Sequence, residues 1–190
     1  MIAHVEAPGV PTRVLPGKVA VWWFLASEIM VFGGLIATYV VFRLGGSGWA
    51  EASHHLSVAL ATVNTLVLLT SSYTVVQAFA AAERGNTSAL RVHLALTILG
   101  GFIFLGLKAV EYTTEIRAGF TPGAGIFWSF YYTMTGLHAL HVLGGIVVNA
   151  VVLATEGTRV EHPHRVELAG LYWHFVDVVW IFLFPLLYLA

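Results

Sequence analysis

Five long segments that are almost free of charged residues dominate this chain of 190 residues. They lie at about 19–42, 56–82, 90–116, 126–155 and 168–190, and each is long enough to cross a bilayer as a helix. Charged residues make up only 10% of the chain, against about 25% in a typical soluble domain. The sequence therefore predicts an all-α fold, an integral membrane bundle of five transmembrane helices at 19–190 that follows an irregular N-terminal tail at 1–18.

The composition excludes several classes of protein and of site. The chain has no cysteine, which excludes disulfides, zinc–thiolate sites, iron–sulfur clusters and copper sites built on thiolates. Its net charge is −1 and it has no basic patch, so no nucleic acid is expected as a partner. The first apolar segment lacks the short core and small-residue cleavage site of a secretory signal, and it is therefore predicted to be a retained helix.

The distribution of basic residues predicts an orientation in the membrane. Five spans put the two termini on opposite sides, and one side then holds the basic residues Arg13, Lys18, Arg84, Arg91, Arg159 and Arg165. The other side holds three, Arg43, Lys108 and Arg117. The positive-inside rule places the N-terminus in the cytoplasm and the C-terminus outside. Lys108 interrupts the third span, so we expect it to snorkel and Glu111 to lie near the membrane boundary.

Ionisable side chains also occur inside the predicted spans, where they are costly unless they find partners. They form four groups on separate segments: Glu28, Glu111 with Glu115, His138 with His141, and His174 with Asp177. Residues three or four apart share a helical face, so each group is expected to lie along one face that meets protein.

Two interpretations of these groups stay open on spacing alone. Histidine and carboxylate side chains on facing helices can hold a metal or a haem. The same side chains can instead form hydrogen bonds between helices and lock the bundle. Glu28, a single acid in its span, would either handle protons or make one hydrogen bond to another helix.

Several segments resemble, in order, subunit III of the haem–copper terminal oxidases. The two most specific are the run Trp173-His174-Phe175-Val176-Asp177 and the pair His138 and His141 before two glycines. The remaining similarity lies at 24–28, which contains Glu28, at 64–72, and at 107–115, which contains Glu111. Together these matches extend over about 22–188.

The resemblance implies a non-catalytic subunit of an aerobic respiratory oxidase, most closely a cytochrome c oxidase. Such a subunit binds the catalytic subunit I and subunit II, and it supports proton uptake while oxygen is reduced to water. The family implies no catalytic, cofactor-binding or metal-ligating residue in this chain, because haem and copper lie in the partner subunits. It makes structural or lipid- and proton-related polar positions of Glu28, Glu111, His138, His141, His174 and Asp177.

The resemblance also implies the inner (plasma) membrane of a bacterial or archaeal-type cell, with membrane lipids as further partners. Longer members of the family have seven helices, and their lipid-binding cleft is formed against two helices that this five-helix chain lacks. Another subunit is the candidate for the missing wall around a bound phospholipid. Two alternatives remain: subunit III of a quinol oxidase or a nitric oxide reductase-associated homologue, and, in a different class, an independent membrane metalloenzyme that uses the buried histidines.

Overall fold

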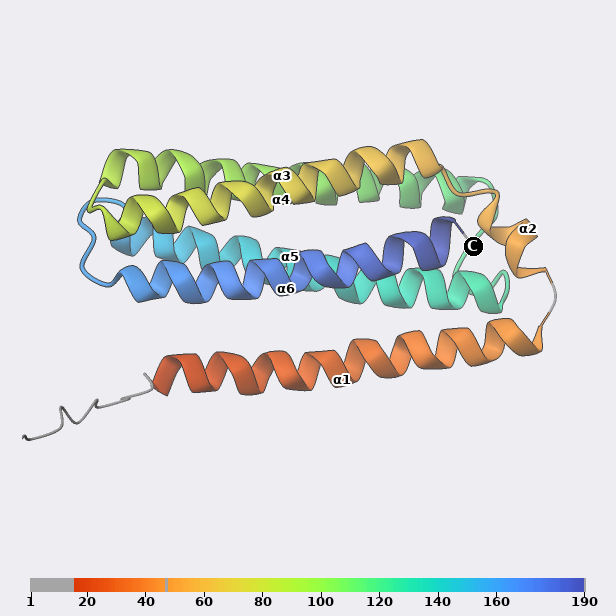
Figure 1. Cartoon of the computed structure of the whole chain (residues 1–190). Coiled ribbons are helices and arrows are strands. Elements are labelled where there is room, and N and C mark those ends of the chain that lie inside the picture. The colour runs from red at the N-terminus through yellow and green to blue at the C-terminus, as the bar shows by residue number, and fades with distance from the viewer. Residues whose placement is uncertain (1–15, 47, 190) are drawn as a thin grey trace, which may run out of the picture.

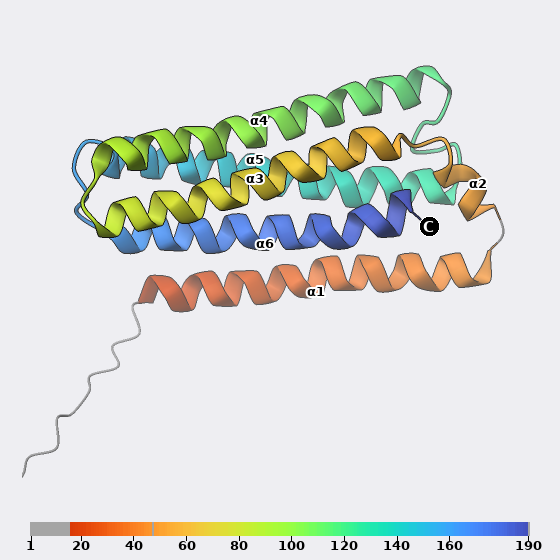
Figure 2. The ribbon, with the colours of Figure 1, turned by 45° about the horizontal axis from the view of Figure 1, so that its top comes forward.

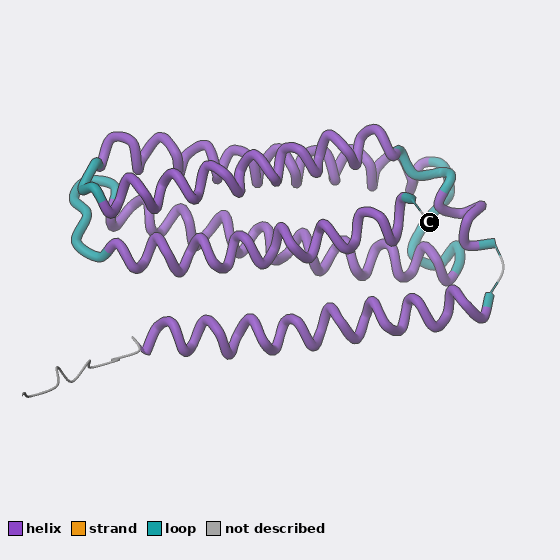
Figure 3. The backbone as a smooth tube through the Cα atoms, viewed as in Figure 1, coloured by secondary structure: helices purple, strands orange, loops and turns teal. Residues whose placement is uncertain are grey.

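The computed structural model describes residues 16–46 and 48–189, and in that part of the chain it contains helices and loops but no strand (Figure 3). The helices are α1 (Pro16–Gly45), α2 (Trp49–Ser53), α3 (Val58–Glu83), α4 (Thr87–Arg117), α5 (Ile126–Glu156) and α6 (Pro163–Tyr188). All except α2 are long and apolar enough to span a membrane. The predicted all-α bundle of five membrane-spanning helices is confirmed.

The helix ends differ from the predicted spans where local chemistry decides the boundary. α6 begins at Pro163 rather than at 168, because proline suits the first helical position, where its missing N–H would have no partner. α1 begins at Pro16, so the end of the predicted tail is helical, and the remainder of that tail lies outside the described residues. The short helix α2 was not predicted.

Four of the long helices form one bundle, and the fifth lies beside it. α3 packs against α4 and α6, and α5 packs against the same two helices. α1 runs alongside α5 and α6, on the side of the bundle away from α3 and α4 (Figure 1, Figure 2). α1 starts at one end of the bundle, and α6 ends at the opposite end (Figure 1).

Glycines bring the helices of this bundle into close contact around a buried tryptophan. A Cβ atom on Gly145 of α5 would lie 2.7 Å from the ring of Trp173, and one on Gly101 of α4 would lie 2.8 Å from the same ring. Between α3 and α4, a Cβ on Gly100 would lie 2.7 Å from the Cβ of Ser71. Small residues let membrane helices approach closely enough for dispersion to hold them. The Trp173 indole fills the space that Gly101 and Gly145 leave.

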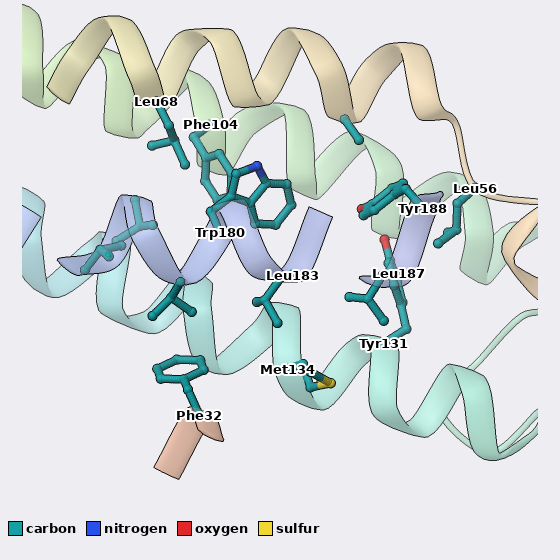
Figure 4. Packing of buried hydrophobic residues seen from close by; sticks show 14 of the residues in the cluster. Phe32, Leu56, Leu68, Phe104, Tyr131, Met134, Trp180, Leu183, Leu187 and Tyr188 are labelled. Carbon is teal, nitrogen blue, oxygen red and sulfur yellow. The ribbon is translucent and has the colours of Figure 1, made fainter. Parts of the chain in front are cut away.

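Aromatic side chains also pack the core around Trp180, a second buried tryptophan of α6. Trp180 of α6 packs edge to face on Phe104 of α4, with their ring centroids 4.8 Å apart. Figure 4 shows this pair beside Leu183 and Leu187 of α6, with Phe32 reaching in from α1. The polar side chains considered next lie within this packed interior or at its edges.

Candidate functional site

Lys108 and Glu111 form an ion pair in the interior of the bundle. Both lie on α4, both side chains are 3% exposed, and the lysine Nζ is 2.9 Å from the glutamate Oε2. The expectation that Lys108 snorkels to the membrane surface is therefore wrong, whereas the position of Glu111 near the membrane boundary stays a prediction. The lysine ammonium has hydrogen-bond acceptors one turn away on α4 and on two neighbouring helices, so it does not depend on water for them.

Two tyrosines complete this group. The Lys108 ammonium also donates to the hydroxyls of Tyr131 on α5, at 3.1 Å, and Tyr188 on α6, at 2.8 Å. Tyr188 in turn donates to the other carboxylate oxygen of Glu111, at 2.7 Å. Figure 4 shows the hydroxyl groups of Tyr131 and Tyr188 pointing into the same space. An ammonium has three protons to donate, and all three have acceptors here, so the network is closed and joins three helices.

Aromatic rings surround the same ammonium group. The Lys108 Nζ lies 4.8 Å from the ring centroid of Tyr131 and 5.5 Å from those of Trp180 and Tyr188, close enough for cation–π attraction. Glu115, which the sequence grouped with Glu111, is buried one turn further along and makes no hydrogen bond to the lysine within the described residues. The charge of Lys108 is thus balanced by one carboxylate and by ring faces.

Glu28 of α1 and His141 of α5 form a second pair. The glutamate Oε2 and the histidine Nε2 are 3.0 Å apart, and both side chains are largely buried. The Phe32 ring packs against the imidazole, and Tyr172 of α6 donates a hydrogen bond to the backbone carbonyl of His141. Three helices therefore meet at this pair, and Glu28 attaches α1 to the bundle.

The hydrogen bonds of His141 restrict where protons lie. Its Nδ1 is 2.8 Å from the carbonyl oxygen of Leu137, and since a carbonyl only accepts, Nδ1 carries a proton. Nε2 and the Glu28 carboxyl would repel each other as two bare acceptors, so a proton also lies between them. The pair therefore holds one proton that can reside on either the acid or the imidazole.

His138 does not belong to this pair and meets different neighbours, although it lies only one turn away from His141. His138 is fully buried between the rings of Trp180, 5.1 Å away, and Phe104, 5.3 Å away. Neither of its ring nitrogens has a hydrogen-bond partner in the described part of the chain. A step of three residues turns about 60° around a helix, which is enough to aim the two rings at different neighbours.

His174 and Asp177 face α3 from α6. The Ser72 hydroxyl of α3 lies 2.6 Å from Nδ1 of His174, which is half-buried. Asp177 is buried beside it, and Ser72 faces its carboxyl group, but neither carboxyl oxygen has a hydrogen-bond partner among residues 16–46 and 48–189. Of these two side chains, His174 makes the polar contact between the helices.

Glu156 has a role that sequence reasoning missed. It is buried at the end of α5, where its Oε2 accepts hydrogen bonds from the backbone N–H groups of Glu161, at 2.7 Å, and His162, at 2.9 Å. Its other oxygen accepts from Arg165, at 3.2 Å. This carboxylate holds the loop that connects α5 to α6. The sequence shows only an acidic residue in a polar connection, which is no signal of a buried acceptor.

The six predicted polar positions do not converge on one centre. Glu28 pairs with His141 and Glu111 pairs with Lys108, while His138 lies between two aromatic rings and His174 and Asp177 both face Ser72. In the described residues, no group of three or more His, Asp or Glu side chains is arranged to hold a metal ion. The arrangement is one of separate contacts between helices.

An apolar groove lies between α1 and the pair α5 and α6. It has a volume of about 700 Å³ and is lined mainly by aliphatic side chains, with Phe24 of α1 and Tyr172 of α6 at one part and Thr155 and Arg165 at another. Gly144, which also lines it, lets the Tyr172 hydroxyl approach α5. The groove can hold a hydrocarbon chain.

Comparison with known proteins decides which family has this architecture. The family model described as cytochrome c oxidase subunit III matches residues 12–190. The chain belongs to the cytochrome c oxidase subunit III family. It is 40% identical to cytochrome c oxidase subunit 3 of Corynebacterium diphtheriae, a match that covers 97% of this chain and 92% of that protein. The identity to cytochrome c oxidase subunit 3 of Bacillus subtilis is 35%, over 96% of this chain and 92% of the relative.

Members of this family are named for more than one electron donor. A probable quinol oxidase subunit 3 of Staphylococcus haemolyticus is 32% identical to the chain, over 90% of this chain and 88% of that protein. The sequence-based identification with subunit III of the haem–copper oxidases is thus confirmed.

Proposed function

We propose that the chain is the non-catalytic subunit III of an aerobic respiratory haem–copper oxidase, in which it stabilises the catalytic subunit I beside subunit II. The observation that carries this proposal is the family match over residues 12–190. The polar groups are consistent with a non-catalytic role. The most buried group lies around Lys108, and all three ammonium protons of this lysine are donated to neighbouring side chains, so none is left to bind a substrate. We favour cytochrome c as the electron donor of the complex, since the relative at 40% identity is named for it, and quinol is the alternative.

Glu28 and His141 are the groups best suited to a role in proton uptake. Their shared proton lies in a partly accessible pair at the edge of the bundle. Movement of that proton between the carboxyl and the imidazole would change the charge on both, without any redox chemistry in this chain. Haem and copper are expected in the partner subunits.

A phospholipid is the expected occupant of the apolar groove between α1 and the bundle. Its aliphatic lining suits an acyl chain, and Arg165 at the rim can meet a phosphate while it stays bonded to Glu156. Replacing Val148 by phenylalanine would narrow the groove and should lower the amount of phospholipid that remains in the purified complex. Unchanged lipid content would contradict this assignment.

The plasma membrane of a bacterial cell is the proposed location, with the N-terminus in the cytoplasm. Bacterial relatives support the membrane, and the distribution of basic residues supports the orientation. Lys108 is buried and paired with Glu111, so we leave it out when the basic residues on the two sides of the membrane are compared. In the described residues this leaves Arg43 and Arg117 at one end against the basic residues Lys18, Arg84, Arg91, Arg159 and Arg165 at the other.

Purification of the tagged chain in mild detergent tests the main proposal. We expect it to bring down subunits that show haem absorption bands. Glu28→Gln should leave these bands intact and reduce turnover, because the variant keeps the hydrogen-bonding shape and loses the exchangeable acid. Glu51→Gln on α2, which changes an exposed acid, is the matched control and should do neither.

Two results would contradict the proposal. The first is a chain that purifies alone with stoichiometric iron or copper, which would support an independent metalloenzyme. The second is loss of a haem band in an assembled Glu28→Gln complex, which would place Glu28 next to a redox centre.

A further inference from the structure

The outward face of α3 carries an unusual row of polar side chains. Thr62, Leu66, Thr70, Tyr73 and Gln77 follow one another at spacings of three or four residues, so they share one helical face. Four of these five residues are polar. The first four of these residues are exposed and Gln77 is half-buried, so this face of α3 is turned away from the bundle.

Tyr73 lies at a depth where a tyrosine hydroxyl has no water. It is about 4 Å along the axis from the middle of α3, whereas half of a bilayer's hydrocarbon core is about 15 Å thick. The side chain is 64% exposed. Its hydroxyl makes no hydrogen bond within the described residues, and neither does the amide of Gln77. Tyrosines that face lipid normally lie at the membrane interface, where the hydroxyl reaches water.

The two threonines of this row behave differently from Tyr73. Thr62 and Thr70 each donate to the backbone carbonyl one turn earlier, so lipid can cover them at little cost. Tyr73 and Gln77 have no such local acceptor. The unmatched polar groups are therefore concentrated in the part of the face from 73 to 77.

His174 adds a third unmatched group beside this face. It lies on α6 about 2 Å from the middle of that helix, and it is joined to α3 through Ser72, the neighbour of Tyr73 in the chain. Its Nδ1 is occupied by Ser72, and its Nε2 has no partner among residues 16–46 and 48–189. An imidazole nitrogen left open to hydrocarbon is costly, as is a phenol.

The outer faces of the other helices are apolar at the same depth apart from Ser27 on α1, whose hydroxyl donates to the backbone carbonyl of Phe24. The exposed residues nearest the middle are Met30 on α1, Phe102 on α4 and Leu140 on α5. Hydrocarbon chains suit all three. The contrast singles out α3, with the adjoining edge of α6, as the surface that lipid covers least well.

We propose that this surface, formed by Tyr73, Gln77 and His174, docks a transmembrane helix of another oxidase subunit. The partner helix presents hydrogen-bonding side chains at mid-depth, which complete the phenol, the amide and the imidazole Nε2. This inference rests on the proposed function, because it requires the chain to be part of an oxidase complex. Acyl chains offer no hydrogen bonds, so lipid alone leaves the three groups unmatched.

Site-directed photocrosslinking in the intact complex tests the inference. A benzoylphenylalanine replaces Tyr73, and in matched variants it replaces Met30, Phe102 or Leu140. After irradiation of membranes, we expect the position-73 variant to yield an adduct with another oxidase subunit, identified by its mass. The three control positions should yield lipid adducts.

Several results would overturn the inference. These are a position-73 product confined to lipid, a product with a second copy of this chain, no subunit adduct at that position, or a subunit adduct at a control position instead. Co-purification of haem-containing subunits is scored in the same samples. If those subunits are absent, the proposed function fails. If they are present but position 73 does not contact them, only the docking surface fails.

A pair of variants measures how much the polar groups contribute. Tyr73→Phe combined with Gln77→Leu removes the hydrogen bonds and keeps apolar bulk. Retention of the chain in the complex should weaken roughly five- to tenfold in a detergent titration, given typical hydrogen bonds between membrane helices. Met30→Leu is the control and should leave retention unchanged, and equal retention of both variants would contradict the proposed role of these groups.

Discussion

At the scale of single residues, the structure shows how a membrane bundle accommodates a full positive charge. Lys108 is tolerated because each of its three protons has an acceptor and because ring faces surround the ammonium. Glu111 is satisfied by the same lysine and by Tyr188. The stability of each group therefore depends on the presence of the other.

This dependence predicts a non-additive pair of substitutions. Glu111→Leu should destabilise the bundle by about 3–5 kcal/mol, because it leaves the Lys108 charge buried without its counter-ion. Adding Lys108→Met should recover most of that loss, since an apolar pair of similar volume needs no partner. Unfolding in mixed detergent and SDS micelles, followed by circular dichroism, measures both. The exposed control Glu51→Gln should change stability by less than about 0.5 kcal/mol. A double variant as unstable as the single one would refute this account.

These residues also mark how far sequence reasoning extends. The spacing of Lys108 and Glu111 shows that an ion pair within α4 is sterically feasible. Tyr131 and Tyr188, which hold the lysine in the interior, are 23 and 80 residues away from it in the chain, and only the packing of α5 and α6 brings them close. Without those partners the default expectation for a lysine near a span end is a snorkelling side chain, and here that expectation was wrong.

At the scale of helices, apolar length predicted five spans, but it could not say which neighbour each face meets. His138 and His141 lie one turn apart on α5, yet the first packs between Phe104 of α4 and Trp180 of α6, and the second pairs with Glu28 of α1. Glycines show the same limit. Gly145 and Gly34 occur in similar Gly-Gly pairs, yet the first lies against Trp173, while the second has no atom within 4 Å of its would-be Cβ.

The two glycines predict opposite outcomes for the same substitution. Gly145→Ala would place a methyl group 2.7 Å from the Trp173 ring, and the helices must separate or the indole must move. We expect a loss of about 1–3 kcal/mol. Gly34→Ala meets open space and should be neutral or slightly stabilising, because alanine favours a helix. Unfolding of the isolated chain in micelles compares them, and equal effects would show that α5 and α6 are not in close contact at Gly145.

At the scale of the whole molecule, the chain consists of a tight four-helix bundle and a first helix held at separate points. α1 is attached by Lys18 to Glu167 at 2.6 Å, by Glu28 to His141 at 3.0 Å, and by the Tyr39 hydroxyl to the backbone carbonyl of Leu186 at 2.9 Å. Apolar grooves lie on either side of the central contact. The Glu28 and His141 pair is therefore the polar contact nearest the middle of α1.

Removing that central contact should loosen α1 without loosening the bundle. The chain has no cysteine, so two cysteines can be introduced at chosen positions and spin-labelled. Pulsed electron paramagnetic resonance then measures the distance between the two labels. With Glu28→Leu and His141→Leu combined, the distance distribution between labels at Met30 and Leu140 should broaden, because α1 then keeps polar contacts to the bundle only near its ends. Labels at Phe102 and Leu140, both on the four-helix bundle, should keep their distribution. Equal broadening of both pairs would mean that the pair supports the whole bundle, and no broadening would mean that apolar packing alone positions α1.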